Sequence, residues 1–342
     1  MKIGIVGYQG SGKSTLFEWL TGVAPDLALG HVGQSAMAAV PDSRIEPLCA
    51  VYSPKKITLA SLEFVDTPGL NRKHEGNAAR LAVIREAGCL VIVTAAHDGG
   101  EALLDAERIQ EDFLLADMEI VSGRMERLRE SVKKPRPSRD QELAELSALE
   151  VVMQALEAST PIADAQMTED QRKATRSFRL LSEKPQLVIC NLADDATDAA
   201  KYAAASNAKR QITAAPIGLE LELARMSPED RAEIEKEYQL TGPRKNDVLR
   251  QVLEASGQIL YFTAGEKEVR SWLLRRGGTA LEAADNIHSD LARGFIRSET
   301  MAAADLIRLG SEREVKAQNL LRQEPKDYVV KEADILHIRF SV

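Results

Sequence analysis

The chain has 342 residues, a formal net charge of −8, and 44 Lys and Arg against 52 Asp and Glu. This length suits about two domains, and the acidic balance argues against a protein that wraps nucleic acid through bulk charge, since phosphate contacts need clustered Lys and Arg. The three cysteines form no CxxC pair, which indicates a reducing compartment without a disulfide framework or a zinc site. We expect a cytoplasmic protein with no membrane or DNA partner, whose first residues, MKIGIVGY, are not a signal peptide.

The first 98 residues have the texture of an α/β domain. Short apolar runs (KIGIVG, LASLEFVD and CLVIV) alternate with helical stretches. This alternation predicts a parallel sheet covered by helices on both faces.

A phosphate-binding loop follows the first of these runs. Gly7, Gly12, Lys13 and Ser14 match the spacing GxxxxGK[ST] between a predicted strand and a predicted helix. The two glycines let backbone amides approach a β-phosphate, Lys13 reaches the β and γ oxygens, and Ser14 supplies a hydroxyl to Mg²⁺. The predicted nucleotide contacts in this loop are Gly7, Gly10, Ser11, Gly12, Lys13, Ser14 and Thr15. The alternative is a chance glycine turn with an unrelated lysine.

A second motif ends the run LEFVDTPGL. It places Asp66 and Gly69 as DxxG, in which the aspartate holds Mg²⁺ through water and the glycine amide meets the γ-phosphate. This is the switch arrangement of GTPases. We therefore predict Ser14 and Asp66 as the metal-binding residues, and Lys13 and Gly69 as the catalytic groups.

A helical hairpin interrupts the α/β pattern between residues 105 and 183. Apolar residues recur at spacings of three and four in two stretches, which predicts two helices with a coiled-coil seam. The segment KKPRPSRD lies between them, and its prolines end the helices. The predicted seam residues are Leu114, Met118, Val121, Met125 and Leu128, then Leu146, Leu149, Val152 or Met153, and Leu156.

Strand texture returns at QLVICNLAD, where Asn191 and Asp194 form NxxD. This is the position from which a base is read in P-loop GTPases. The alternative for Asp194 is a capping or loop carboxylate. From Gln258 the sequence changes again to a mixed α+β stretch. We predict a nucleotide-binding domain (1–104 and 184–257), the hairpin (105–183) and a small C-terminal domain (258–342).

Nearly the whole chain resembles the YchF / Obg-like ATPase family. The resemblance lies in VPDSRIEPLCAVYSPKKITLASLEFVDTPGL, in DFLLADMEIV, and above all in YFTAGEKEVRSW and NIHSDLARGFIRSE. It implies a Ras-like P-loop NTPase domain, an inserted helical domain and a C-terminal TGS-type β-grasp domain. It also implies a ribosome-associated NTPase that can favour ATP over GTP.

The sequence departs from the family pattern near the predicted site. Gly10 stands where the family usually has an asparagine, which in related GTPases helps to bind potassium. The first switch contains no threonine, and Ser35 is only a weak substitute. The motif NLAD replaces the usual NxxE. The loop after CLVIV is shorter than the family's, so the catalytic histidine that the family carries there cannot be placed, and the nearby His97 is interpreted as a surface residue. Leu70 follows DxxG, where many related GTPases have glutamine; here the chain agrees with the resemblance, which implies a hydrophobic residue at this position. We expect nucleotide binding to survive and turnover to be slow.

Two functions remain open from the sequence. One is a slow ATPase or GTPase with Mg²⁺, in which bound nucleotide orders residues 25–40 and 66–80 and controls docking to a ribosome or RNA. The other is a non-catalytic ribosome or RNA adaptor with a vestigial nucleotide site. Candidate phosphate contacts of the partner are Lys133, Lys134, Arg136 and Arg139 at the hairpin tip, and Arg275, Arg276, Arg293 and Arg297 in the C-terminal domain. A solvated turn and a charge-balanced surface are the alternatives for these two groups.

Overall fold

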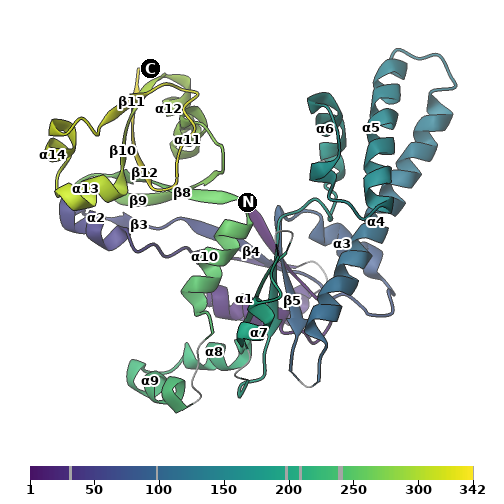
Figure 1. The fold of residues 1–342 in the computed structure, drawn as a ribbon, viewed down its shortest axis with the longest axis horizontal. Helices are drawn as coiled ribbons and strands as arrows, with labels where there is room; N and C mark the ends of the chain where they lie inside the picture. Colours follow the sequence, from purple (N-terminus) through teal and green to yellow (C-terminus); the bar gives the residue numbers. More distant parts are fainter. Residues whose placement is uncertain (31–32, 98, 197–198, 208–209, 238–241, 342) are drawn as a thin grey trace. The chain divides into compact units, whose positions relative to one another are not determined.

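The computed structural model describes residues 1–30, 33–97, 99–196, 199–207, 210–237 and 242–341 (Figure 1). By their contacts the residues form two units. The first comprises Met1–Ala36 and Glu63–Lys245, and the second comprises Met37–Leu62 and Asn246–Val342. Residues 37–62 thus pack with the C-terminal part of the chain. The three-part scheme with boundaries at 104, 183 and 257 stays a prediction.

A six-stranded sheet carries the first unit, in the order β2-β4-β1-β5-β6-β7. Strand β1 pairs in parallel with β4 and β5, and β5, β6 and β7 continue the parallel ladder. The apolar runs are central strands, so nearly all their side chains are buried. The strands are β1 (Lys2–Val6), β2 (Gln34–Ala39), β4 (Ser61–Asp66), β5 (Cys89–Ala95), β6 (Gln186–Asn191) and β7 (Gln211–Ala215).

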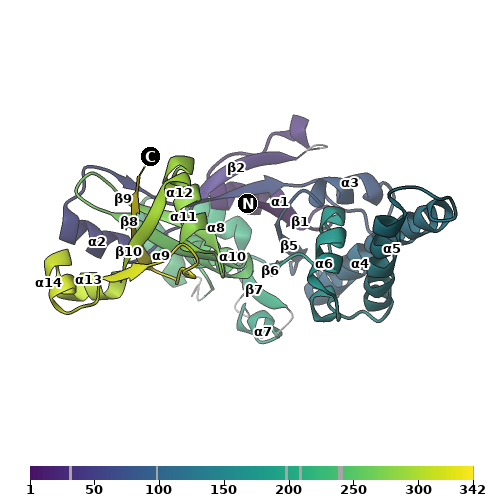
Figure 2. The same cartoon turned by 90° about the horizontal axis from the view of Figure 1, so that it is seen from above.

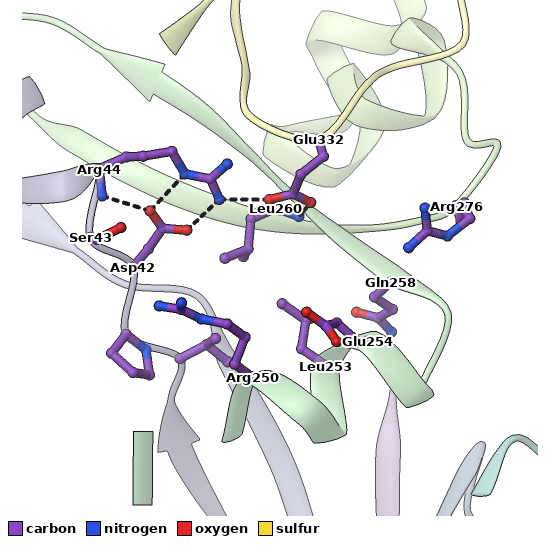
Figure 3. Close-up of a pocket in the computed structure, with 12 residues that line it drawn as sticks. Asp42, Ser43, Arg44, Arg250, Leu253, Glu254, Gln258, Leu260, Arg276 and Glu332 are labelled. Atoms are coloured by element: carbon purple, nitrogen blue, oxygen red, sulfur yellow. Dashed lines mark hydrogen bonds and ion pairs between the residues drawn. The ribbon is translucent and has the colours of Figure 1, made fainter. Parts of the chain in front are cut away.

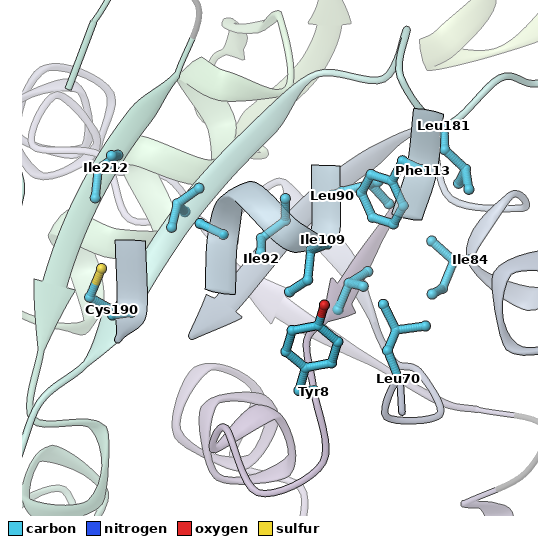
Figure 4. Packing of buried hydrophobic residues seen from close by; sticks show 14 of the residues in the cluster. Tyr8, Leu70, Ile84, Leu90, Ile92, Ile109, Phe113, Leu181, Cys190 and Ile212 are labelled. Carbon is cyan, nitrogen blue, oxygen red and sulfur yellow. The ribbon is translucent and has the colours of Figure 1, made fainter. Parts of the chain in front are cut away.

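Helices connect these strands and cover the sheet. Helix α3 and the first part of α4 share one hydrophobic core with the sheet, which contains Ile84 of α3, Ile109 and Phe113 of α4 and Ile92 of β5 (Figure 4). The helices of this unit are α1 (Lys13–Thr21), α3 (Asn77–Ile84), α4 (Ala102–Ser131), α5 (Arg139–Glu157), α6 (Glu169–Thr175), α7 (Ala199–Ala203), α8 (Ile217–Leu223) and α9 (Pro228–Glu237), with short 3-10 turns η1 (Leu27–Leu29), η2 (Ile162–Asp164) and η3 (Arg176–Phe178).

The inserted hairpin is formed by α4 and α5, which lie side by side in Figures 1 and 2. Its separate core contains the seam residues Val121, Met125, Leu128, Leu149, Val152 and Leu156, all buried. The expected helical hairpin is therefore confirmed. Helix α4 begins at Ala102, and its first turns pack on the sheet core before its second half meets α5.

The second unit is built on a six-stranded sheet in the order β11-β10-β12-β8-β9-β3. Its strands β8 and β9 form an antiparallel hairpin, while β12 runs parallel to β8 and antiparallel to β10. This mixed sheet with helices agrees with the expected α+β domain. The strands are β3 (Ile57–Thr58), β8 (Gln258–Ala264), β9 (Val269–Arg275), β10 (Phe295–Ala302), β11 (Arg322–Glu324) and β12 (Asp334–Phe340).

Two hydrophobic cores hold the second sheet. One joins helix α2 to α13 through Ile45, Leu48, Phe262 and Met301, and the other contains Tyr261. Helix α2 and strand β3, which the sequence scheme assigned to the nucleotide-binding part, thus complete the second unit. Its helices are α2 (Ile45–Tyr52), α10 (Lys245–Ala255), α11 (Ala280–Ile287), α12 (Ser289–Arg293), α13 (Ala303–Leu309) and α14 (Glu312–Ala317). In the described ranges, no helix has the length and apolar character needed to cross a membrane.

Candidate functional site

The loop between β1 and α1 is a tight turn that depends on its glycines. A Cβ on Gly7 would lie 2.3 Å from the carbonyl oxygen of Val93. Gly12 has a φ of 96°, and a Cβ there would lie 2.3 Å from Nδ2 of Asn191. Crowding by strands β5 and β6 therefore fixes the loop against the carboxyl end of the sheet.

Gly10 is a glycine for a different reason. Its φ is 81°, and a Cβ built on it would meet no heavy atom of the described part of the chain within 4 Å. Residues with a side chain rarely adopt this left-handed conformation. The loop needs a left-handed residue at this point, and the space beside it is open.

Lys13, Ser14 and Asp66 converge just beyond this loop. The ammonium of Lys13 donates a hydrogen bond to the carbonyl oxygen of Tyr8 at 2.8 Å, and burial lowers the pKa of Lys13 to about 8 against the opposing charge of Asp66. The hydroxyl of Ser14 donates to Oδ2 of Asp66 at 2.6 Å. Burial raises the pKa of Asp66, although Ser14 and Lys13 act in the opposite direction. A buried ammonium and a half-buried carboxylate thus lie in one site, and burial disfavours the charged form of each.

The same residues fit a magnesium ion. Oδ1 of Asp66 is buried and has no hydrogen-bond partner among the residues that the structure describes. A carboxylate and a hydroxyl are the hard oxygen ligands that Mg²⁺ uses, usually with several waters and substrate phosphates completing the shell. Within the described ranges, no group of three or more His, Cys, Asp or Glu could hold a metal on its own. A phosphate-assisted ion at Ser14 and Asp66 is the arrangement that this donor set suits.

A pocket of about 230 Å³ opens over these groups. Lys13, Ser14, Asp66, Gly10 and Gly69 all line it, so both sequence motifs meet there. The complete lining is Gln9, Gly10, Lys13, Ser14, Asp26, Leu29, Gly30, Gln34, Asp66, Thr67, Pro68 and Gly69. The size and polar lining suit a phosphate group rather than a whole nucleotide.

Asp26 and Gln34 are among the pocket residues that sequence reasoning missed. The backbone amide of Asp26 donates to Oε1 of Gln34 at 2.6 Å, and Oδ1 of Asp26 accepts from the amide of Ala28 at 2.9 Å. Gln34 lies in the stretch LGHVGQSAMAAVP, which contains no threonine. The candidate substitute Ser35 instead lines a different pocket of about 220 Å³ with Lys2, Val65 and Val83. Part of the expected switch, residues 31–32, lies outside the described residues.

Leu70, the residue after DxxG, points away from the pocket. Its side chain is fully buried in the core between the sheet and α4, beside the ring of Tyr8 (Figure 4). Its backbone pairs with the phosphate loop, because the Leu70 amide donates to Gly7 O at 2.9 Å and Leu70 O accepts from the Gln9 amide at 3.1 Å. A hydrophobic residue at this position anchors the segment after DxxG and offers no group to orient water.

Asn191 and Asp194 lie at the end of β6 in different environments. The buried Asn191 amide donates to Ser11 O at 3.2 Å, and its Oδ1 accepts from the Ile217 amide at 3.1 Å. It therefore joins the phosphate loop to the start of α8. Asp194 is exposed, and its Oδ1 lies 3.5 Å from where a Cβ on Gly218 would stand. Both residues flank the loop without lining the pocket at Asp66.

Of the basic residues proposed for partner contact, all are exposed except Arg297, which is half-buried. At the hairpin tip Lys133 pairs with Glu130, and Nε of Arg139 donates to Val132 O at 3.0 Å. In the second unit three of the four arginines pair with acidic neighbours: Arg275 with Glu282, Arg293 with Asp290, and Arg297 with Glu299. The tip therefore keeps more uncompensated positive charge than the second group.

A larger pocket of about 500 Å³ lies within the second unit (Figure 3). Arg44 donates to Asp42 and, at 2.6 Å, to Oε1 of Glu332, and Arg250 and Arg276 also line the pocket. Its acidic and basic side chains balance, and it holds no glycine cradle. The smaller pocket over Lys13 therefore remains the candidate functional site.

Comparisons with known proteins agree with this geometry. A family model described as "50S ribosome-binding GTPase" matches residues 2–122. The model YchF-GTPase_C, described as "Protein of unknown function (DUF933)", matches residues 258–341. The two matches fall on the phosphate-loop part and on the C-terminal part of the chain.

Curated relatives match from end to end. The chain is 33% identical to "Ribosome-binding ATPase YchF" of Bacillus subtilis, over 99% of this chain and 99% of the relative. It is 31% identical to the protein of that name from Haemophilus influenzae, over 100% and 99%. It is 32% identical to "Obg-like ATPase 1" of Oryza sativa subsp. indica, over 100% and 92%.

A solved structure shows the same fold. The "Structure of the Schizosaccharomyces pombe YchF GTPase" matches with a TM-score of 0.82 at 26% identity, over 99% of this chain and 97% of that one. The resemblance seen in the sequence is confirmed, and the chain belongs to the YchF family of P-loop NTPases.

Proposed function

We propose that this chain is a nucleotide-binding, ribosome-associated NTPase that hydrolyses ATP or GTP slowly with Mg²⁺. The observation that carries the proposal is the convergence of Lys13, Ser14, Asp66 and Gly69 on one pocket. The names of the relatives, a ribosome-binding ATPase and a GTPase, support both the nucleotide hydrolysis and the ribosome association. We assign the protein to the cytoplasm on the same grounds.

Each residue has a role in the proposed reaction. The backbone amides of the loop and the ammonium of Lys13 hold the phosphates, while Ser14 and Asp66 hold the ion. Bound Mg²⁺ would supply charge stabilisation to the transferring phosphoryl group. We assign the amide of Gly69, which lines the pocket, to the γ-phosphate. Because Leu70 faces the core, water orientation is left weak, and we expect turnover near the unassisted Ras value of about 10⁻⁴ s⁻¹.

Base selection is assigned to the end of β6. We propose that Asn191 fixes the loop and that the exposed carboxylate of Asp194 contacts the base. A carboxylate accepts from guanine N1 and N2, whereas adenine offers its exocyclic amine on that edge. We expect both ATP and GTP to bind with modest discrimination.

The first experiment measures binding and steady-state hydrolysis of ATP and of GTP, in competition, with and without Mg²⁺. Lys13→Ala should abolish tight binding without unfolding the chain. Lys2→Ala is the matched control, since Lys2 lies on β1 outside the pocket. Wild-type affinity in Lys13→Ala would reject the nucleotide site. Binding without any turnover would favour the non-catalytic adaptor instead.

The second experiment tests the ribosome. The tip residues Lys133 and Lys134 are exposed, so Lys133→Glu with Lys134→Glu reverses local charge without touching the core. Co-sedimentation with ribosomes should be weaker in this variant than in the wild type. Added salt should weaken the co-sedimentation of the wild type more steeply than that of the variant. Lys173→Glu with Lys326→Glu, an equal charge change on exposed sites elsewhere, is the control. Equal loss in both variants would assign the effect to net charge alone.

A further inference from the structure

Helix α4 buries three aspartates, and two of them, Asp105 and Asp112, bind residues of the phosphate loop or of the segment after DxxG. Their exposed fractions are 2% and 6%. A buried carboxylate is unfavourable unless it is paired and hydrogen-bonded. Each should therefore have a specific partner, and the partners lie on the two segments that frame the phosphate pocket.

Asp112 holds the phosphate loop and the segment after DxxG at once. The hydroxyl of Tyr8 donates to Oδ2 of Asp112 at 3.3 Å, and Nδ1 of His74 lies 2.9 Å from its Oδ1. Burial and the Asp112 carboxylate raise the pKa of Tyr8 to about 12, so this hydroxyl stays protonated and donates. His74 has a φ of 63°, a conformation uncommon for a residue with a side chain.

Tyr8 connects Asp112 to the pocket. Its carbonyl oxygen accepts the hydrogen bond of Lys13, and its backbone bridges to Leu70. Its ring lies under the guanidinium of Arg72, at 4.9 Å from Cζ to the ring centre, and Arg72 binds both oxygens of Asp105 at 3.0 and 2.6 Å. One set of contacts on α4 thus fixes Lys13 on one side of the pocket and the residues that follow Gly69 on the other.

These contacts position the two segments that frame the pocket and do not themselves bind the phosphates. Most contacts to a β-phosphate come from the loop amides between Gly7 and Ser14, which Asp112 does not touch. A γ-phosphate must lie between Lys13 and Gly69, so its reaction depends on the spacing of the two segments. Positioning supplies most of the rate in phosphoryl transfer.

We propose that Asp112 is a positioning residue for nucleotide turnover, acting through Tyr8 and His74, and that it ties the hairpin helix α4 to the phosphate site. The inference rests on the proposed function, because it requires a turnover to be positioned. Linkage makes the tie reciprocal: whatever shifts α4 changes the nucleotide site, and nucleotide shifts α4 by the same free energy.

The test compares three substitutions. Asp112→Asn keeps the volume but removes the charge, so Tyr8 and His74 can no longer both bind a carboxylate. Tyr8→Phe removes one hydroxyl and keeps the ring under Arg72. Asp117→Asn is the matched control: Asp117 is a fully buried aspartate on the same helix, but it binds Arg85, Leu181 and Ser182 and contacts nothing in the phosphate loop.

We expect Asp112→Asn and Tyr8→Phe each to lower kcat roughly tenfold, the size of one hydrogen bond to a charged group. Affinity for a nucleoside diphosphate, which lacks the γ-phosphate, should change less than about twofold, since the loop amides remain. The double variant should lose no more than the larger single loss, because both act through one contact. Asp117→Asn should lower thermal stability and leave kcat within about twofold.

Unchanged kcat in Tyr8→Phe would overturn the inference, and so would an equal loss of kcat in Asp117→Asn. Tyr8→Phe decides the matter even if Asp112→Asn does not fold. A wild-type chain with no turnover would overturn the proposed function together with the inference. Measurable turnover in the wild type, with kcat unchanged in Asp112→Asn and Tyr8→Phe, would overturn the inference alone.

Discussion

Replacing Gly12 by alanine should destabilise the first unit through two separable effects. The φ of 96° makes any side chain there unfavourable by about 1–2 kcal/mol. The new Cβ would also lie 2.3 Å from Nδ2 of the buried Asn191, which must then move. Asn191 would lose its bonds to Ser11 O and from the Ile217 amide, each worth roughly 0.5–1.5 kcal/mol. The total loss of unfolding free energy is on the order of 2–5 kcal/mol.

Gly10→Ala is the matched control for this prediction. Gly10 shares the left-handed conformation, but its added Cβ meets nothing within 4 Å, so only the cost of about 1–2 kcal/mol should appear. The difference between the two variants isolates the collision with Asn191. In an Asn191→Ala background the cost of Gly12→Ala should fall to that of Gly10→Ala.

Tryptophan fluorescence allows this measurement on one unit at a time. The chain has two tryptophans, and Trp19 is buried in α1 directly after the loop, whereas Trp272 lies in the second unit. In a Trp272→Phe background, urea unfolding followed through Trp19 reports the first unit. Equal destabilisation by Gly12→Ala and Gly10→Ala would show that the loop moves away from Asn191, and the packing argument would be wrong.

Three further predictions concern chemistry. Asp66→Asn should abolish the Mg²⁺ dependence of nucleotide affinity, because the buried Oδ1 would be lost as an anionic ligand. Nucleotide titration with and without chelator measures this dependence. An unchanged effect of Mg²⁺ would show that the ion binds elsewhere. Asp194→Ala should change the ratio of ATP to GTP affinity in competition binding, and a constant ratio would exclude it as the base contact. Turnover should be the same in sodium and potassium, since Gly10 has no side chain to bind the ion; a potassium response of about tenfold or more in a steady-state assay would show that another group has replaced it.

Local rules predicted the parts of the molecule that depend on neighbours in sequence. Gly7 and Gly12 stand where the turn leaves no room for a side chain. Their spacing from each other and from Lys13 therefore predicted the phosphate loop from the sequence alone. The three-and-four spacing of the hairpin residues likewise gave both helices, since a seam needs one apolar face. Leu70 was seen as a missing water ligand, while its burial against α4 appeared only in the structure.

Contacts between distant residues could not be predicted in this way. Strand β3 pairs Ile57 with Val269, which places a short piece of the first hundred residues in the second sheet. Tyr8 and Asp112 are 104 positions apart, and a buried aspartate within a long charged helix has no distinguishing pattern. Asp26 and Gln34 line the pocket, although the segment that contains them carries no sequence motif. Such pairs depend on how the packed elements approach one another, which composition and period do not specify.

The continuity of α4 gives the molecule a mechanical property. Its 30 residues are shared by the sheet core at one end and the hairpin core at the other, without a proline between them. At 1.5 Å per residue, Asp112 lies about 15 Å from the start of the helix and Ser131 about 44 Å, so a pivot near Ala102 would enlarge a sideways shift of about 1 Å at Asp112 to about 3 Å at the tip. Ser122 and Gly123 lie along this arm, and such pairs are where helices bend, so part of the amplified motion would be absorbed there. A pivot of this kind would transmit motion at the phosphate loop to the hairpin tip, and the stiffness of α4 at Gly123 would set how much of that motion reaches the tip.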